Sequence, residues 1–187
     1  MTDETGSVGD AIAAWAAARE AAGEGGHDRP GAAGAPRSVT DGAVVELCEI
    51  TGETVRAICR LQVAPSQRGL VAPNAVSLAE ALFEPKAWYR GVYADDRPVG
   101  FVMLYDDREA GRMFLWRLMV ADGCQGLGYG WRALELVAEH ARTLPGVTAL
   151  VVSWVPGPGS PEAFYLAFGF EPTGDVEDGE VVGRLRL

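Results

Sequence analysis

The sequence has little of what several common protein classes need. Lys86 is its only lysine, and the formal net charge is -10 at pH 7. Because binding to phosphate backbones depends on clustered positive charge, we expect no nucleic acid among its partners. The chain also has no run of eighteen apolar residues, and no basic segment followed by an apolar one stands near its first residue. We therefore expect no membrane partner and no secretory signal.

Cysteine and histidine are also scarce. The three cysteines, Cys48, Cys59 and Cys124, are an odd number without metal-ligand spacing, and the chain has two histidines. These counts favour neither a zinc site nor a disulfide framework, so we expect no metal cofactor. Free thiols are typical of a reducing compartment, and we expect a cytoplasmic protein.

Composition divides the chain into two parts. Residues 1–42 are rich in alanine and glycine and contain few large apolar side chains. We expect a mostly disordered tail, with a helix within residues 10–22 that would need a surface to pack on. Residues 43–187 have the hydrophobic content and the length of one domain.

The pattern of apolar residues and turns in this domain favours a mixed sheet. The expected elements are a strand at 44–49, a helix after Thr51, a second helix through Leu78, Ala79, Leu82 and Phe83 with Asn74 or Ser77 as its cap, three strands in hairpin order over 88–121, a helix over 130–144, a buried strand over 147–154, a short helix opened by Ser160 and Pro161, and a final hairpin. The predicted fold class is α/β, with six to seven strands flanked by about four helices.

The most specific stretch lies in the middle of the domain. An apolar strand ending in Leu118-Met119-Val120 runs into Gln125-x-x-Gly128-x-Gly130, and an amphipathic helix follows directly. Glycines allow positive φ and close approach, so successive amides can point at a phosphate, and the helix N-terminus adds its dipole. The spacing differs from those of the ATP-type P-loop and of the dinucleotide fingerprint. The stretch therefore predicts a pyrophosphate site.

This stretch resembles the acetyl-CoA signature of the GNAT superfamily of N-acetyltransferases. The segment from Glu162 to Phe170 resembles the late helix of the same superfamily, and the resemblance covers roughly residues 43–187. It implies the GNAT fold, acetyl-CoA as cosubstrate, and a strand backbone that binds the pantetheine arm. The implied cofactor-binding residues are Leu118, Met119, Val120, Gln125, Gly126, Leu127, Gly128, Tyr129, Gly130 and Trp131.

The same resemblance assigns a general acid. From spacing alone, Tyr165 is one of several aromatic residues packed on a helix, but the family pattern implies that its phenol protonates the departing thiolate. The loop before this helix departs from the superfamily pattern. Residues 156–160 include no asparagine, whereas the superfamily often carries one there that helps to hold the cofactor.

Longer segments, at 69–81, 99–103 and 174–182, resemble the bacterial spermine/spermidine (diamine) N-acetyltransferases. This resemblance implies transfer of the acetyl group to a primary amine of a small molecule, with a polyamine favoured. Carboxylates and aromatic faces are the groups that bind ammonium. The candidate substrate-binding residues are Glu80, Glu84, Trp88, Tyr89 and Trp116, and Glu80, Glu84 and Glu180 are the candidate bases.

Other readings stay open at this point. The acceptor could instead be an amine-bearing antibiotic, an amino-acid derivative or a protein amine. An alternative of another class is a non-catalytic module that binds acyl-CoA, which the altered loop at 156–160 keeps open. Homodimers are common among resembling proteins, so a second copy of the chain is a further candidate partner.

Overall fold

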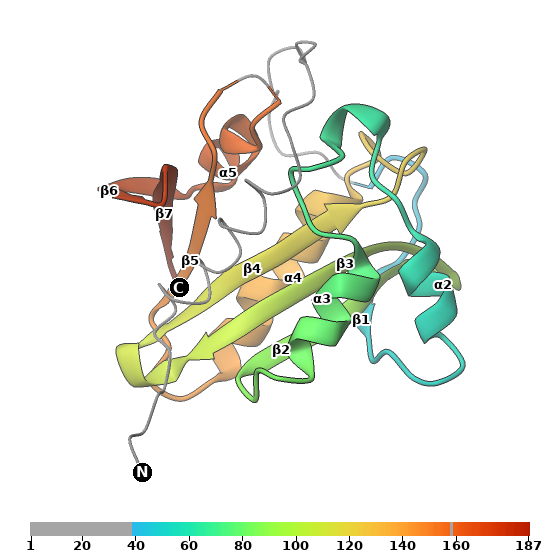
Figure 1. The fold of residues 1–187 in the computed structure, drawn as a ribbon, viewed down its shortest axis with the longest axis horizontal. Helices are drawn as coiled ribbons and strands as arrows, with labels where there is room; N and C mark the ends of the chain where they lie inside the picture. Colours follow the sequence, from blue (N-terminus) through green and yellow to red (C-terminus); the bar gives the residue numbers. More distant parts are fainter. Residues whose placement is uncertain (1–38, 158) are drawn as a thin grey trace.

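The computed structural model describes residues 39–157 and 159–187, so the helix expected within residues 10–22 lies outside the described residues. Within that part, seven strands form one sheet with four α-helices around it (Figure 1). The strands are β1 (Val45–Cys48), β2 (Ala87–Ala94), β3 (Arg97–Asp107), β4 (Arg112–Val120), β5 (Ala149–Trp154), β6 (Glu171–Glu177) and β7 (Glu180–Arg186). The helices are α2 (Val55–Arg60), α3 (Asn74–Ala81), α4 (Tyr129–Thr143) and α5 (Glu162–Phe168). The predicted fold class is confirmed.

The strands follow the order β1-β2-β3-β4-β5-β7-β6. All neighbours are antiparallel except β4 and β5, which run parallel because the crossover helix α4 connects them. This parallel pair is short: Arg112, Met113 and Phe114 pair with Ala149, Leu150 and Val151, and no pair is formed beyond them. We call residues 115–120 of β4 and 152–154 of β5, where the strands diverge, the splayed segment.

Helices cover both faces of the sheet. In Figure 1, α3 lies in front of β2 and β3, α2 lies to its right, and α4 lies behind the sheet; residues of α2 and α3 pack in one cluster with Phe101 and Met103 of β3. The face of α4 that carries Leu134, Val137 and Ala141 is buried against the sheet. Residues 99–105 of β3 are all buried, because the strand is covered on both sides.

A β-bulge interrupts the pairing of β4 with β3. Met103 pairs with Arg117 and Leu104 with Leu115, so Trp116 has no partner across the ladder. The extra residue re-aims the neighbouring side chains. As a result Trp116 and Arg117 both lie on the face that carries α2 and α3, where Trp116 packs against the cluster that contains Ile58, Phe101 and Met119.

Several details of the helix ends differ from the sequence prediction. Pro73, not Asn74 or Ser77, is the N-cap of α3. The Asn74 side chain is buried and donates to the Ile58 carbonyl at 2.8 Å, which ties α3 to α2. The helix ends at Ala81, so the side chains of Leu82 and Phe83 are exposed rather than packed.

The ends of the other helices shift by a few residues. The N-cap of α2 is Thr54 rather than Thr51, and Pro161 is the N-cap of α5 rather than its first helical residue. Ser160 still accepts a hydrogen bond from the Glu162 amide at 3.2 Å. No helix in the described residues is long and apolar enough to cross a membrane.

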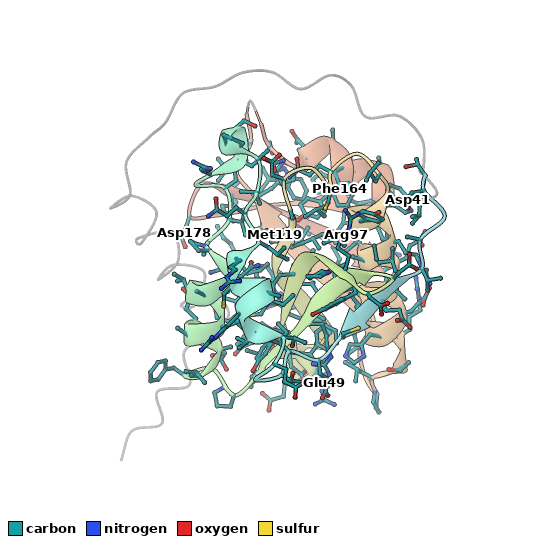
Figure 2. All side chains as sticks on the ribbon, turned by 90° about the vertical axis from the view of Figure 1, so that its right-hand side faces the viewer. Asp41, Glu49, Arg97, Met119, Phe164 and Asp178 are labelled. Carbon is teal, nitrogen blue, oxygen red and sulfur yellow. The ribbon has the colours of Figure 1, made fainter. Side chains whose placement is uncertain are left out.

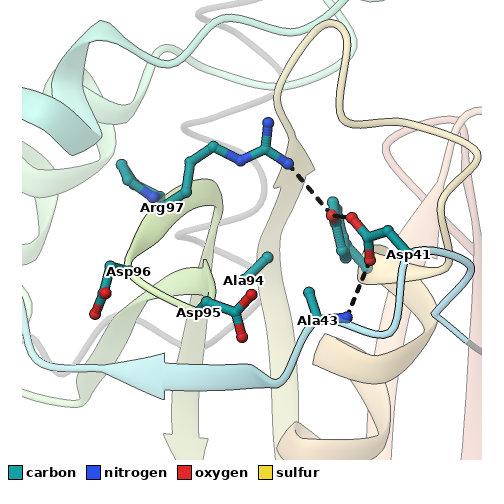
Figure 3. A pocket seen from close by; sticks show the side chains of 8 residues that line it. Asp41, Ala43, Ala94, Asp95, Asp96 and Arg97 are labelled. Carbon is teal, nitrogen blue, oxygen red and sulfur yellow. Dashed lines mark hydrogen bonds between the residues drawn. The ribbon is translucent and has the colours of Figure 1, made fainter.

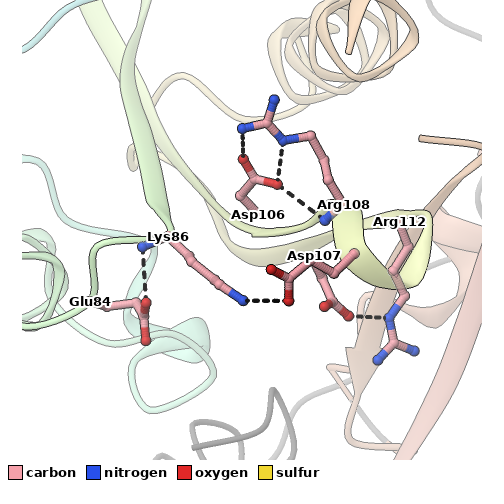
Figure 4. A network of polar contacts seen from close by, with 7 residues as sticks. Glu84, Lys86, Asp106, Asp107, Arg108 and Arg112 are labelled. Atoms are coloured by element: carbon pink, nitrogen blue, oxygen red, sulfur yellow. Dashed lines mark hydrogen bonds and ion pairs between the residues drawn. The ribbon is translucent and has the colours of Figure 1, made fainter. Parts of the chain in front are cut away.

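A charged network lies at the connection between β3 and β4 (Figure 4). Arg108 pairs with Asp106 at 2.7 Å, and Arg112 pairs with Asp107 at 2.6 Å. This connection precedes β4, whereas the glycine-rich turn follows it, so the two lie at opposite ends of the strand. Exposed pairs of this kind contribute little to stability.

Candidate active site

The glycine-rich turn joins the end of β4 at Val120 to the start of α4 at Tyr129. Its backbone uses conformations that side chains disfavour: φ is 74° at Gly123, 75° at Gly126 and 88° at Gly128, which is the N-cap of α4. Turns of this kind aim successive amides at one point, and the helix dipole adds partial positive charge there. The local geometry therefore suits an anion.

Gly130 serves a different purpose from the glycines of the turn. It lies within the first turn of α4, where a Cβ atom would stand 3.3 Å from a methyl group of Val120. The missing side chain lets α4 start close against the end of β4. Strand, turn and helix are thereby held in one compact unit.

The splayed segment exposes one side of the β4 backbone. The Ala121 amide donates to Val99 of β3 at 2.8 Å. Because successive amides alternate along a strand, those of Val120 and Leu118 face away from β3, towards the diverging β5. Their side chains pack on the α4 side, whereas Met119 is buried on the α2 and α3 side. The exposed amides could bind an extended ligand like an added strand.

Two further contacts hold the turn in place. The Gln125 amide nitrogen donates to the Gln67 side chain at 2.5 Å and to the Val120 carbonyl at 3.0 Å. On the other side, the Thr40 amide donates to the Leu127 carbonyl at 3.1 Å. The turn is therefore fixed from both flanks by residues distant in the sequence.

Tyr129 anchors the first residue of α4. Asp41 and Arg97 lie near each other in Figure 2, and the close-up shows both at one pocket (Figure 3), whose lining also includes Tyr129. The Tyr129 hydroxyl donates to Asp41 and accepts from Arg97 at 3.3 Å. The bond to Asp41 raises the pKa of Tyr129 and lowers the pKa of Asp41. Residues 39–43 thus act as a strap across the turn, which the sequence analysis missed.

Trp131 connects α4 to α5. Its indole packs against Phe164 and Phe168 of α5, with ring centroids 6.2 and 4.9 Å apart, and its Nε1 donates to Glu135 at 2.9 Å. This packing fixes α5, and with it Tyr165, against the start of α4.

Tyr165 lies in α5 and is 7% exposed. Its ring contacts Trp154, Phe164 and Phe170, so the aromatic packing expected from spacing alone is present. Burial raises the pKa of the Tyr165 phenol, and the negative charge of Glu180 raises it further. The phenol is therefore protonated at neutral pH, as a proton donor must be.

The opposite face of the sheet carries a buried cation. Arg117 is 3% exposed and pairs with Glu80 of α3 at 3.1 Å, across the face that holds Trp116. Burial lowers the pKa of Arg117 to about 10, although the charges of Glu80 and Glu180 oppose the shift. The side chain thus stays charged at neutral pH. Its place within an apolar strand is explained by these carboxylates.

The structure does not bring all the predicted substrate residues together. Glu84 lies beyond the end of α3, where its carboxylate accepts from the Lys86 amide at 2.9 Å, so it is not one helical turn from Glu80. Trp88 lies on the α4 face and stacks on His140, with ring centroids 4.4 Å apart. Tyr89 packs on the α2 and α3 face. Glu80, Tyr89 and Trp116 therefore share a face, and Trp88 does not.

Two buried donors border the splayed segment. The indole nitrogens of Trp116 and Trp154 are buried, and neither has a hydrogen-bond partner in residues 39–157 and 159–187. Buried polar groups in native proteins nearly always have partners. One indole belongs to β4 and the other to β5, and they lie on opposite faces of the sheet, so a ligand bound between these strands would satisfy an indole only with an acceptor on that indole's own face.

A sheet whose parallel strands β4 and β5 diverge beside a glycine-rich strand-to-helix turn is the arrangement of the GNAT fold. The chain belongs to the acetyltransferase (GNAT) family, whose model matches residues 63–170, more than half of its length. It is therefore an acetyl-CoA-dependent N-acetyltransferase. The residues present fit acetyl-CoA, with strand amides and a buried indole donor for the pantetheine arm and glycine amides for the pyrophosphate.

One curated relative and several solved structures are similar to this chain, the structures in fold. A spermine/spermidine N(1)-acetyltransferase of Bacillus subtilis is 26% identical over 147 residues, covering 74% of this chain and 95% of the relative. An acetyltransferase of Thermus thermophilus has a similar fold, with a TM-score of 0.63, 23% identity, and coverage of 76% of this chain and 97% of that one. The PaiA N-acetyltransferase of Thermoplasma acidophilum, solved with coenzyme A, has a TM-score of 0.58 at 17% identity, with coverage of 77% and 99%.

Proposed function

We propose that this enzyme transfers the acetyl group of acetyl-CoA to a primary amine of a small molecule, and that the amine is a polyamine. The observation that carries the proposal is the position of the splayed segment. It lies between the glycine-rich turn, the buried phenol of Tyr165, and a face of the sheet that carries carboxylates. The two reactants would therefore approach one point from different sides.

Each group then has a chemical task. Acetyl-CoA supplies the acetyl group and a sulfur leaving group. The amides of residues 126–130 hold the pyrophosphate, and those of Leu118 and Val120 align the pantetheine arm. The Tyr165 hydroxyl donates its proton to the leaving sulfur, which is a contribution of about 10²–10⁴-fold in rate.

The acceptor side supports a cationic substrate. Glu80 lies on the same face as the Trp116 and Tyr89 rings, and its carboxylate reaches the surface of the protein at the end of α3. A carboxylate beside aromatic faces is a favourable site for ammonium. The Bacillus subtilis relative acts, by its name, on spermine and spermidine. Aminoglycosides, amino acids and lysine peptides also carry ammonium groups, so a panel of acceptors must separate them from polyamines.

The test is release of the coenzyme A thiol from acetyl-CoA across a panel of spermidine, spermine, diamines, aminoglycosides, amino acids and a lysine peptide. We expect turnover with the polyamines. The Tyr165→Phe variant should reduce kcat about 100-fold and leave the Kd for coenzyme A unchanged, since it removes only the proton donor. Tyr93→Phe, which removes a hydroxyl from β2, is the matched control and should keep full activity.

Other results would redirect the proposal. Turnover confined to another class on the panel would reassign the acceptor. Coenzyme A binding without turnover of any amine would indicate a non-catalytic acyl-CoA-binding module. Full activity in Tyr165→Phe would remove the phenol from the mechanism.

A further inference from the structure

Glu180 is a carboxylate buried at the start of β7. It is 2% exposed, and Ser153 of β5 donates its hydroxyl to Oε2 of Glu180 at 2.5 Å. Taking a carboxylate out of water is costly unless it is hydrogen-bonded or serves a charged partner. The other acidic residues of the β6–β7 hairpin, Glu171, Asp175, Glu177 and Asp178, are exposed. Glu180 is thus set apart from its neighbours by its position.

The alternation of side chains places this carboxylate on a particular face. Ser153 follows Val151 by two residues, and Val151 packs with Phe114 and Trp116. The Ser153–Glu180 pair therefore lies on the face of Trp116 and Arg117. Trp154, the next residue of β5, points to the opposite face and packs on Tyr165.

The splayed segment consequently has the buried phenol of Tyr165 on one face and the buried carboxylate of Glu180 on the other. Tyr165 and Glu180 interact electrostatically: burial raises the pKa of Tyr165, and the charge of Glu180 raises it further. Glu180 also opposes the lowering of the pKa of Arg117 that burial causes. The charge of Glu180 thus acts on Tyr165 and on Arg117, while its contact with Ser153 fixes its place at β5.

We propose that Glu180 is the group that binds the acceptor ammonium and removes its proton, and that Ser153 is a positioning residue that orients the Glu180 carboxylate. This inference rests on the proposed function and assigns the base that the sequence left open among three carboxylates. Ser153, the donor to Glu180, had no signal in the sequence, because a serine in an apolar strand is common.

The protons balance as follows. Glu180 takes one proton from R–NH₃⁺, which frees the nitrogen lone pair to form the C–N bond as the C–S bond breaks. Tyr165 gives its proton to the sulfur and regains one from the nitrogen. Glu180 then releases its proton to water, so the products are the amide, the thiol and one proton. The acid and the base act from opposite faces, so neither has to change places during the reaction.

The test compares Glu180→Gln with Ser153→Ala in the full chain. With spermidine as acceptor, we expect Glu180→Gln to lower kcat/KM about 100-fold at pH 7. Its remaining rate should rise with pH in step with the fraction of neutral amine in solution, whereas the wild type should level off. Calorimetry should show weaker spermidine binding and an unchanged Kd for coenzyme A. Arg117 and Glu80 also face this region, so their charges contribute to both profiles, and Tyr165 approaches it from the opposite face.

Ser153→Ala keeps the carboxylate and is the second variant should the first fail to fold. We expect its kcat/KM to fall about threefold to tenfold, and the midpoint of its pH profile to move, because the carboxylate loses its donor. Glu177→Gln is the matched control: Glu177 pairs with Glu180 in the β6–β7 ladder, is exposed, and should leave every quantity unchanged.

The outcomes separate the two proposals. If the wild type acetylates spermidine and Glu180→Gln keeps its rate and pH profile, the assignment of Glu180 is overturned and the proposed function stands. If the wild type acetylates no amine, the proposed function fails. In that case loss of spermidine binding in Glu180→Gln alone still supports Glu180 as the ammonium ligand, and equal binding overturns it.

Discussion

The two sides of this site are built in different ways. The proposed cofactor side is one continuous stretch, from Leu118 to Trp131, in which strand, turn and helix follow each other directly. The proposed acceptor side is assembled from Glu80 of α3, Trp116 and Arg117 of β4, and Ser153 and Glu180 from β5 and β7. The first is specified by local backbone preferences, and the second by the register of the sheet.

This difference determines how each side should respond to substitution. A change of backbone preference in the turn should disturb the cofactor alone. A change of charge on the acceptor side should disturb the amine alone, and also the stability of the fold, because buried charges there are balanced against one another. Three substitutions test whether the two sides respond separately, and they are given in order of decreasing expected effect.

The largest effect is expected from Gly128→Val on the cofactor side. Gly128 has a φ of 88°, which costs an L-residue roughly 1–2 kcal/mol, and a β-branched residue fits worst. The turn should relax and misalign its amides, so the Kd for coenzyme A should rise about 100-fold, equivalent to roughly 2.7 kcal/mol. Calorimetry with coenzyme A measures this directly.

Gly52→Val is the control for that substitution. Gly52 has no positive φ, and a Cβ atom there meets no neighbour, so binding should not change. A folded Gly128→Val protein with a normal Kd would show that the turn does not hold the pyrophosphate.

A smaller effect is expected from Glu80→Gln on the acceptor side. The substitution removes the charge that pairs with buried Arg117 but keeps an acceptor for its hydrogen bond. Because Glu80 is about one-third exposed, at 34%, solvent screens part of the loss. We expect the KM for the amine to rise about tenfold, the free energy of unfolding to fall by about 1 kcal/mol, and the Kd for coenzyme A to stay constant.

Glu84→Gln separates this effect from a general loss of negative charge. Glu84 accepts a hydrogen bond from the Lys86 backbone, and glutamine can do the same. Steady-state kinetics and urea unfolding on both variants are the measurements. Equal increases in KM would mean that the acceptor side responds to net charge and not to the Arg117 partner.

The smallest effect is expected at His140, which belongs to neither side. Burial lowers the pKa of His140 below 6.5, the charge of Arg90 adds to this, and Asp106 opposes it. The unfolded chain therefore takes up the proton first as the pH falls below 6.5, so protons favour unfolding there. Urea unfolding at pH 7.5 and 5 should show a slightly larger loss of stability in the wild type than in His140→Gln. A larger loss in the variant would contradict the sign, and neither KM should change at pH 7.5.

What the sequence could predict follows the same division. The succession of strands and helices along the chain and the glycine-rich turn could be predicted because alternation, turn residues and positive-φ glycines act over a few neighbouring residues. The bulge at Trp116 could not, because it depends on the pairing of β4 with β3. Without it, Trp116 and Arg117 would point to opposite faces.

The acceptor side depends on the fold in the same way. The expected helix ran through Leu82 and Phe83, whereas α3 ends at Ala81, so Glu84 lies outside the helix that carries Glu80. Trp88 and Tyr89 are adjacent in β2 and therefore point to opposite faces of the sheet. The contact of Asp41 with Tyr129 spans 88 residues and leaves no local pattern.

The short pairing of β4 with β5 also has a mechanical meaning. Strands β1–β4 and strands β5–β7 are joined within the sheet through only three paired positions, so the splayed segment is a seam between two halves of one domain. A cofactor bound along that seam would contact both groups of strands and would therefore stabilise the fold as well as take part in the reaction. At a hundredfold excess over its Kd it would add about 2.7 kcal/mol to the stability of the fold. Amide hydrogen exchange in β4 and β5 would then slow when the cofactor is bound. The amine would bind to this more rigid, cofactor-bound form of the enzyme.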